Sequence, residues 1–171
     1  GAHASGRNSG VIHAGFYYSP ETLKAKFCRE GNEALSELAS NNGLSLKKTG
    51  KVVVTKNSNE VPNLIELYNR GLENGVSLEI FESSELTYFE PLARTKEAFI
   101  WSPNTCVASP QEIIGVLAKI FENKGGSIFL GKKIEKLTDS TMQVDGKVVK
   151  FDLAINCAGT QAINFAHSMG V

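Results

Sequence analysis

The chain has 171 residues, 42% of them hydrophobic, which is enough for one domain with a buried core. Its 18 basic and 18 acidic side chains cancel, which excludes an electrostatic case for nucleic acid or an anionic membrane surface. No apolar run approaches the roughly 18 residues of a membrane span. The three cysteines lie far apart without a Cys-x-x-Cys pair, so neither a zinc site nor a disulfide framework is indicated. These features favour a cytoplasmic protein in a reducing compartment, and they leave peripheral membrane association open.

A run of small and hydrogen-bonding residues, Ala4 to Gly15, lies near the start of the chain and contains one histidine, His13. Gly6, Gly10 and Gly15 carry no side chain, so backbone N–H groups here could approach an anion or a planar ligand closely. The same pattern also fits a glycine-rich entry loop that leads into a short strand. The residues by themselves leave both interpretations open.

The next part of the chain is predicted to begin with a long helix. Ser19-Pro20 is typical of a capped helix start, and the apolar spacing that follows predicts one buried face up to about residue 40. The predicted buried residues are Leu23, Phe27, Cys28, Ala34, Leu35 and Leu38. The valines of Lys51 to Thr55 then predict a strand that is buried on both faces.

Shorter helices and strands are predicted up to Gly126. Asn57 to Glu60 is typical of a capping box before a second helix, which ends at Gly75. Ser77 to Phe81 reads as a strand, and the short helix after Ser83 breaks at Glu90-Pro91. Ala98 to Trp101 reads as another strand. Ser109-Pro110 predicts a further helix start, whose predicted buried residues are Ile113, Ile114, Leu117, Ile120 and Phe121.

The final part is predicted to be mainly β. Alternating residues predict strands at 128–130, 134–137 and 142–144, and Asp145-Gly146 is a strong signal for a two-residue hairpin. Asp152 to Cys157 reads as a last strand, followed by a helix from Thr160 to Met169. The alternation along the whole chain predicts an α/β or α+β fold, with a mixed β-sheet and packed helices.

Several segments resemble the L-2-hydroxyglutarate dehydrogenase and oxidase family. This family belongs to the FAD-dependent oxidoreductases that also include D-amino-acid oxidase and glycine oxidase. The resemblance rests on Ser5 to Gly15, Tyr17-Tyr18, Leu23 to Cys28, Gly50 to Val54, Leu67 to Leu72, Glu90-Pro91 and Ile155 to Gly159. It implies a flavoprotein that transfers a hydride from a 2-hydroxy acid to FAD.

The chain lacks the G-x-G-x-x-G fingerprint that precedes the first of these segments in the family. We therefore expect an internal piece of a longer flavoenzyme. The resemblance assigns residues 1–18 and 127–171 to a partial FAD-binding region and residues 19–126 to a partial substrate region.

The resemblance also implies residues that bind the cofactor. Ser5, Gly6, Asn8 and Ser9 match the segment along the pyrophosphate and ribityl part of FAD. Ile134 matches a position whose backbone meets the adenine. Ala158 and Gly159 match a turn that touches the diphosphate. No metal is implied.

Candidate catalytic and substrate residues follow from the same resemblance. His13 would lie near the flavin ring, either as the base that removes the hydroxyl proton or as a structural histidine. Arg7 stands where many relatives have histidine, and Ser109 replaces an expected acid, as a helix cap or with a change of substrate. Lys24 could steer an acidic substrate or simply face solvent. Arg94 could clamp a carboxylate or lie on the surface.

The expected function is part of an FAD-dependent oxidation of a 2-hydroxy acid, with L-2-hydroxyglutarate as the expected substrate. Two alternatives stay open: an amine or amino-acid oxidase of the glycine oxidase type, and a catalytically inert domain without flavin. An unpaired apolar edge at Asp152 to Cys157 further predicts a homodimer or a domain swap.

Overall fold

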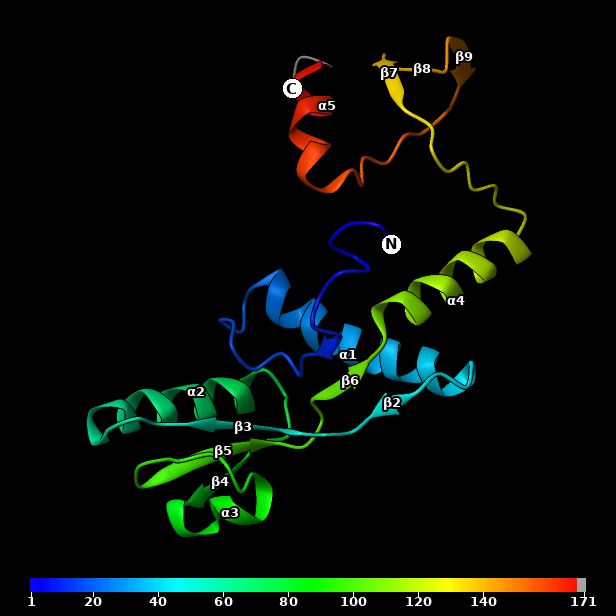
Figure 1. Ribbon diagram of the computed structural model, residues 1–171. Helices are drawn as coiled ribbons and strands as arrows, with labels where there is room; N and C mark the ends of the chain where they lie inside the picture. The colour runs from blue at the N-terminus through cyan, green and yellow to red at the C-terminus, as the bar shows by residue number, and fades with distance from the viewer. Residues whose placement is uncertain (169–171) are drawn as a thin grey trace. The chain divides into compact units, whose positions relative to one another are not determined.

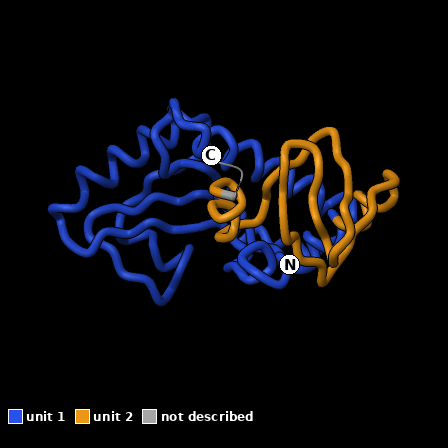
Figure 2. Tube along the Cα trace, turned by 90° about the horizontal axis from the view of Figure 1, so that it is seen from above, with its two compact units in different colours: residues 1–117 blue, residues 118–171 orange. Residues whose placement is uncertain are grey.

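The computed structural model describes residues 1–168. The chain divides into two compact units, residues 1–117 (unit 1) and residues 118–171 (unit 2), as Figure 2 shows in blue and orange. Helices and small antiparallel sheets make up both units, which confirms the mixed fold class. The functional assignment of 1–18, 19–126 and 127–171 stays a prediction, and residues 1–18 lie in the same compact unit as residues 19–117.

Unit 1 contains most of the helices and two of the sheets (Figure 1). Its helical segments are α1 (Leu23–Asn41), η1 (Ser58–Glu60), α2 (Val61–Glu73), η2 (Ser83–Glu85), α3 (Leu86–Phe89) and the start of α4 (Pro110–Asn123). Its strands are β1 (Val11–Ile12), β2 (Leu46–Lys47), β3 (Lys51–Val54), β4 (Glu79–Glu82), β5 (Ala98–Ser102) and β6 (Cys106–Ala108).

The sheet β3-β5-β4 separates two apolar clusters, because successive residues of its central strand face opposite sides. Ile100 on β5 is fully buried in a cluster with Phe16 and with Leu64 of α2. Phe99 and Trp101 pack with Phe89 of α3 on the other side, at ring-centroid distances of 5.3 and 5.0 Å. Figure 1 shows α2 and α3 on opposite faces of this sheet.

The smaller sheet β1-β6-β2 positions the glycine-rich loop. Val11 pairs with Val107 and Ile12 with Cys106, and both pairs are antiparallel. Ile12, Cys106 and Ala108 are buried together against Leu35 of α1 and Ile113 of α4. The residues before β1 and the histidine after it are therefore held at the edge of a packed core. The sequence reading had missed β6, a strand of only three residues that follows a turn.

Unit 2 contains the sheet β7-β8-β9, with β7 at Ile134–Leu137, β8 at Thr141–Val144 and β9 at Lys147–Lys150. The predicted hairpin is confirmed: Asp145 and Gly146 join β8 to β9 with φ values of 49° and 74°. A turn η3 (Gly159–Gln161) leads into α5 (Ala162–Ser168). Met169, the predicted last residue of this helix, lies outside the described residues.

The prediction for the first helix was wrong in two respects. The N-cap is Thr22, whose hydroxyl accepts from the N–H of Ala25 at 3.2 Å, and Ser19 lies in the turn before it. The fully buried residues of α1 are Ala25 and Ala39, whereas Leu23 and Phe27 are 68% and 59% exposed. α1 comes close to the backbone at Gly15, where an added Cβ would lie 3.4 Å from the carbonyl oxygen of Ala25, so a small residue suits position 25.

Other helix and strand predictions were correct in place but not in burial. The helix α4 begins at Pro110 as expected, with Ser109 accepting from the N–H of Glu112 at 3.4 Å. Leu117 and Phe121 are nevertheless exposed, and Ile113, Ile114 and Ile120 are half-buried. The strand β3 is half-buried with an exposed Val54, because it lies at an edge of its sheet. The strand predicted at 77–81 begins two residues later, at Glu79.

Two predicted strands do not form in the described structure. Residues 128–130 and Asp152 to Cys157 have no ladder partner among residues 1–168. Leu130, Leu153 and Ile155 are 84%, 77% and 78% exposed. An apolar alternating segment becomes a strand only when another strand satisfies its backbone groups.

Candidate functional site

The glycine-rich loop before β1 is braced by its own side chains. The Asn8 amide donates to the carbonyl oxygens of Ala4 and Ser5, each at 3.0 Å, and its oxygen accepts from the N–H of Gly10 at 2.9 Å. Gly10 has φ +71°, and a Cβ there would lie 2.2 Å from the carbonyl oxygen of Ala108. Glycine is therefore required where the loop passes β6.

A cavity of about 160 Å³ lies beside this loop. Ser5, Asn8 and Gly10 line it together with residues of β1, α1 and α4. Gly6 is buried in the same loop, and its carbonyl accepts from the Gln111 side chain of α4 at 2.5 Å. Within residues 1–168, no hydrogen bond is recorded for the backbone N–H groups of Asn8 and Ser9. Of these two residues, Asn8 lines the cavity. Free backbone N–H groups in such a loop are donors of the kind that bind phosphate oxygens.

His13 follows β1 directly, and its backbone is fixed by one side chain of α1. The Asn32 amide donates to the carbonyl oxygens of Ile12, His13 and Asn104, at 3.1, 3.3 and 3.0 Å. Partial burial of the imidazole, and then the positive charge of Lys51, hold the pKa of His13 below its ordinary value of 6.5. The neutral imidazole, which is the form that can accept a proton, is thereby favoured.

Lys51 was not singled out by the sequence reading. It is the first residue of β3, and its ammonium lies 4.4 Å from the centre of the Tyr17 ring and 5.7 Å from that of Phe16. The Gly-Lys-Val-Val-Val segment signals a strand, but nothing in it indicates a partner 34 residues earlier. The contact depends on how β3 packs against residues 15–18, which we call the tyrosine loop.

The tyrosine loop is held by residues of α2 and by the residue that follows it. The Asn74 amide donates to the carbonyl oxygens of Gly15 and Tyr18, at 3.1 and 2.9 Å. The Arg70 guanidinium donates to the carbonyl of Tyr17 at 3.2 Å and pairs with Glu66. These bonds order the loop that carries the aromatic rings around Lys51.

The three predicted substrate residues are not brought together. Arg7 is exposed, and its recorded hydrogen bond is from its backbone N–H to Ala4. Lys24 is exposed on α1, with its ammonium 5.5 Å from the centre of the Tyr18 ring. Arg94 is exposed and donates to two carbonyl oxygens of its own loop, those of Pro91 and Ala93. Their roles stay predictions.

Unit 2 contains a larger, mainly apolar cavity of about 600 Å³. It brings Ile134 of β7 together with Ala158 and with the apolar residues of the segment Phe151 to Cys157. Gly159 has φ +58°, and a Cβ built on it meets no atom within 4 Å, so a ligand could approach the backbone there. A cavity of this size that is lined mainly by apolar side chains is typical of a small-molecule site.

Neither a cluster of metal-ligating side chains nor a membrane-spanning helix is present in residues 1–168. No group of three or more His, Cys, Asp or Glu residues could hold a metal ion. No helix is long and apolar enough to cross a membrane.

The sequence was then compared with protein families and with known proteins. The family model described as "FAD dependent oxidoreductase", DAO, matches residues 1–170. The chain belongs to this family. The predicted membership of the FAD-dependent oxidoreductases is thereby confirmed.

Individual proteins are also similar to this chain in sequence. The mitochondrial L-2-hydroxyglutarate dehydrogenase of Caenorhabditis elegans is 40% identical over 139 residues, 81% of this chain and 32% of the relative. L-2-hydroxyglutarate dehydrogenase of Escherichia coli K12 is 32% identical over 174 residues, 99% of this chain and 41% of the relative. The chain therefore spans about a third to two fifths of the curated relatives it matches.

The fold of this DAO family member is also found in solved structures. Glycine oxidase from Geobacillus kaustophilus is similar with a TM-score of 0.84 and 16% sequence identity, over 100% of this chain and 49% of that one. At this identity the similarity shows the shared fold alone.

Proposed function

We propose that this chain is part of an FAD-dependent enzyme that oxidises a 2-hydroxy acid, with L-2-hydroxyglutarate as the substrate. The observation that carries the proposal is the 32–40% identity with L-2-hydroxyglutarate dehydrogenases over 81–99% of the chain. The oxidase alternative of the glycine oxidase type has support only from the fold, at 16% identity.

The residues present fit parts of FAD. The free N–H groups of Asn8 and Ser9, with the Ser5 hydroxyl, would bind phosphate and ribityl oxygens. Gly6 would support this segment from behind, because its N–H donates to His3 and a Cβ there would meet Gly1. In unit 2, the backbone at Ile134 would contact the adenine, and the open turn at Ala158 and Gly159 would accept the diphosphate.

His13 supplies the acid–base chemistry in this proposal. FAD, when bound, accepts the hydride that leaves C2 of the substrate. The His13 imidazole, whose lowered pKa favours the neutral form, removes the hydroxyl proton as the carbonyl forms. Asn32 keeps the backbone of His13 in place for this step.

Visible spectroscopy tests the proposal. The protein is purified with all the sequence that its gene encodes, mixed with FAD and desalted, and L-2-hydroxyglutarate is then added without oxygen. Retained flavin absorbance that bleaches on addition of the substrate is the expected result. A colourless protein would support the inert alternative, and bleaching by glycine but not by L-2-hydroxyglutarate would support the glycine oxidase type.

We also propose that Asp152 to Cys157 pairs with a second copy of the chain. Leu153 and Ile155 are exposed, and this segment has no strand partner among residues 1–168. Light scattering should detect a dimer that Ile155→Lys weakens, with Ile163→Lys on exposed α5 as the matched control. A monomer at high concentration would contradict the pairing.

The cellular compartment of the protein is also a proposal. All three cysteines, Cys28, Cys106 and Cys157, are free thiols, and we propose a reducing environment such as the cytoplasm on this basis.

A further inference from the structure

Lys51 is held in one position by aromatic rings. Its ammonium lies over the ring of Tyr17 at 4.4 Å and within 5.7 Å of the Phe16 ring centre. Cation–π contacts at these distances favour one placement of an otherwise flexible side chain. The strand beneath is also fixed, because Lys51 pairs with the fully buried Ser102 of β5. The position of the Lys51 ammonium is therefore fixed without a bound ligand.

This charge has no carboxylate partner within residues 1–168. The recorded ion pairs there are Arg70–Glu66 and Lys132–Asp145, and neither includes Lys51. Lys51 is half-buried, so its ammonium has lost part of its hydration without gaining a counter-charge. A carboxylate oxygen accepts an N–H group more fully than the face of an aromatic ring does. The arrangement favours an anion supplied by a ligand.

Three other cations of unit 1, Arg70, Arg94 and Lys24, are differently placed. Arg70 is already paired with Glu66, and Arg94 donates to carbonyl oxygens of its own loop. Lys24 lies over Tyr18 at the longer distance of 5.5 Å and is exposed on α1. Lys51 is also the cation whose charge reaches the imidazole of His13.

We propose that Lys51 binds a carboxylate of the 2-hydroxy acid whose hydroxyl proton His13 removes. This inference rests on the proposed function and adds a specificity-determining residue to it. A 2-hydroxy acid needs a base at its hydroxyl and a cation at its carboxylate. The Lys51 ammonium lies over Phe16 and Tyr17, which follow His13 by three and four residues in the same segment. Tyr17 and Phe16 position the ammonium, and Asn32 positions the histidine.

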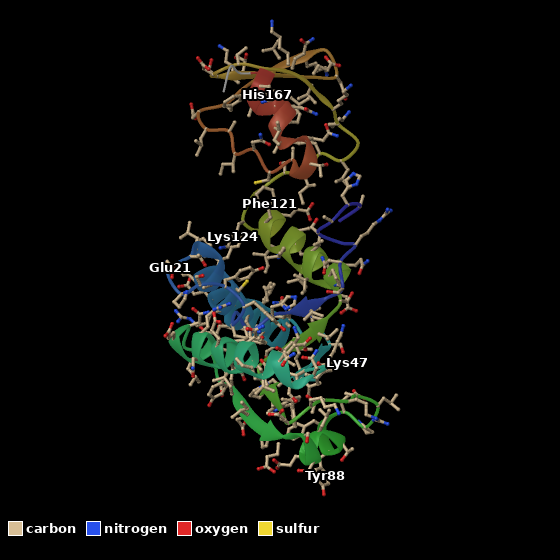
Figure 3. All side chains as sticks on the ribbon, turned by 90° about the vertical axis from the view of Figure 1, so that its left-hand side faces the viewer. Glu21, Lys47, Tyr88, Phe121, Lys124 and His167 are labelled. Atoms are coloured by element: carbon tan, nitrogen blue, oxygen red, sulfur yellow. The ribbon has the colours of Figure 1, made fainter. Side chains whose placement is uncertain are left out.

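The test compares Lys51→Met with Lys51→Arg and with Lys47→Met in the FAD-loaded protein that carries all the sequence its gene encodes. Lys47, labelled in Figure 3, is an exposed lysine of β2 and serves as the matched control. Lys51→Met should raise KM for L-2-hydroxyglutarate about 10- to 100-fold, as loss of a charged hydrogen bond predicts. Because the carboxylate does not react, kcat should change much less. Lys51→Arg should recover part of the loss, and Lys47→Met should leave KM unchanged.

A second substrate shows which carboxylate is bound. L-2-hydroxyvalerate has the same carbon chain without the second carboxylate. A rise in KM for both substrates assigns Lys51 to the carboxylate on C1, and a rise for the diacid alone assigns it to the distal one. An unchanged KM in Lys51→Met for both substrates overturns the inference.

Calorimetric titration with glutarate, which has no hydroxyl to oxidise, separates this inference from the proposed activity. Glutarate binding that is lost in Lys51→Met, together with no oxidation of L-2-hydroxyglutarate by the wild type, would overturn the activity and leave the carboxylate site in place. Oxidation of L-2-hydroxyglutarate by the wild type and by Lys51→Met with equal KM would support the proposed activity and overturn the carboxylate site. Far-ultraviolet circular dichroism and Tm show that each variant is folded.

Discussion

Both units contain apolar segments with the spacing of strands or helices, but only unit 1 buries them. In unit 1, Phe16, Phe99 and Ile100 are at most 1% exposed, and each lies between a sheet and another layer. In unit 2, no described residue from 118 to 167 is buried, and Leu130, Leu153 and Ile155 are more than three quarters exposed. The difference teaches that an apolar alternating pattern buries itself only when the partner strand or layer is within reach of the same unit.

The largest expected effect comes from removing core volume in unit 1. Ile100→Ala leaves a cavity in the cluster around Phe16 and Leu64, and should lower the free energy of unfolding by about 2 to 5 kcal/mol. The matched change in unit 2, Ile155→Ala, should cost about 0.5 kcal/mol or less, because that side chain is 78% exposed. Urea unfolding of both variants measures the contrast. Equal losses would show that unit 2 buries Ile155 in solution.

A glycine pair sharpens the comparison. Gly50 and Gly131 have nearly equal positive φ values, 64° and 69°, but a Cβ on Gly50 would lie 1.8 Å from the Trp101 ring, whereas one on Gly131 meets nothing within 4 Å. Gly50→Ala should therefore cost about 2 to 4 kcal/mol, from backbone strain and displacement of the ring. Gly131→Ala should cost about 1 kcal/mol from strain alone. Thermal unfolding of the two variants is the measurement, and a Trp101 fluorescence change is expected only for Gly50→Ala.

The pH dependence of stability and of kcat/KM tests whether unit 1 contains a catalytic site as well as a buried core. Folding lowers the pKa of His13, so the unfolded chain binds this proton more readily. The resulting stability is present above pH 6.5 and is lost as the pH falls through the lowered value. If His13 is the base, kcat/KM rises with pH through the same value.

Lys51→Met removes the second cause of the lowered pKa, so it should move that rise in kcat/KM to higher pH. His13→Asn should abolish the rise, and His3→Gln, an exposed histidine with no proposed role, should leave it unchanged. A rise that persists in His13→Asn would show that another group is the base.

The smallest effects are expected from the exposed ion pairs, one in each unit. Glu66→Gln breaks the pair with Arg70 on α2, and Asp145→Asn breaks the pair with Lys132 while keeping a residue that tolerates the hairpin turn. Each change should alter the free energy of unfolding by about 0.5 kcal/mol or less, because water and salt screen both pairs. Urea unfolding at low and high salt measures this. If only one of the two changes lowers the free energy of unfolding by more than about 1 kcal/mol, that ion pair stabilises its unit more than an exposed pair usually does.

Much of the local structure could be predicted because its causes are close in sequence. The helix that begins after Ser109, the turn at Asp145-Gly146 and the end of α1 at Asn42 and Gly43 all follow from caps and glycine conformations. The residues of Ala4 to Gly15 left two interpretations open, a ligand-contact segment and a glycine-rich entry loop. The cavity beside the free N–H group of Asn8 favours the first, which stays a prediction. The burial of α1 was not predictable in the same way, because its contact face depends on neighbours that come from other parts of the chain.

The sequence by itself determined the family of this protein, the positions of most helices and the single histidine of the glycine-rich segment, since these depend on residue identity and short-range spacing. Only the tertiary structure decided that Lys51 lies on Tyr17 and within electrostatic range of His13, and that Asp152 to Cys157 forms no strand within the described residues. Strand pairing and side-chain contacts join residues that are distant in sequence, so their energies appear only once the layers have packed.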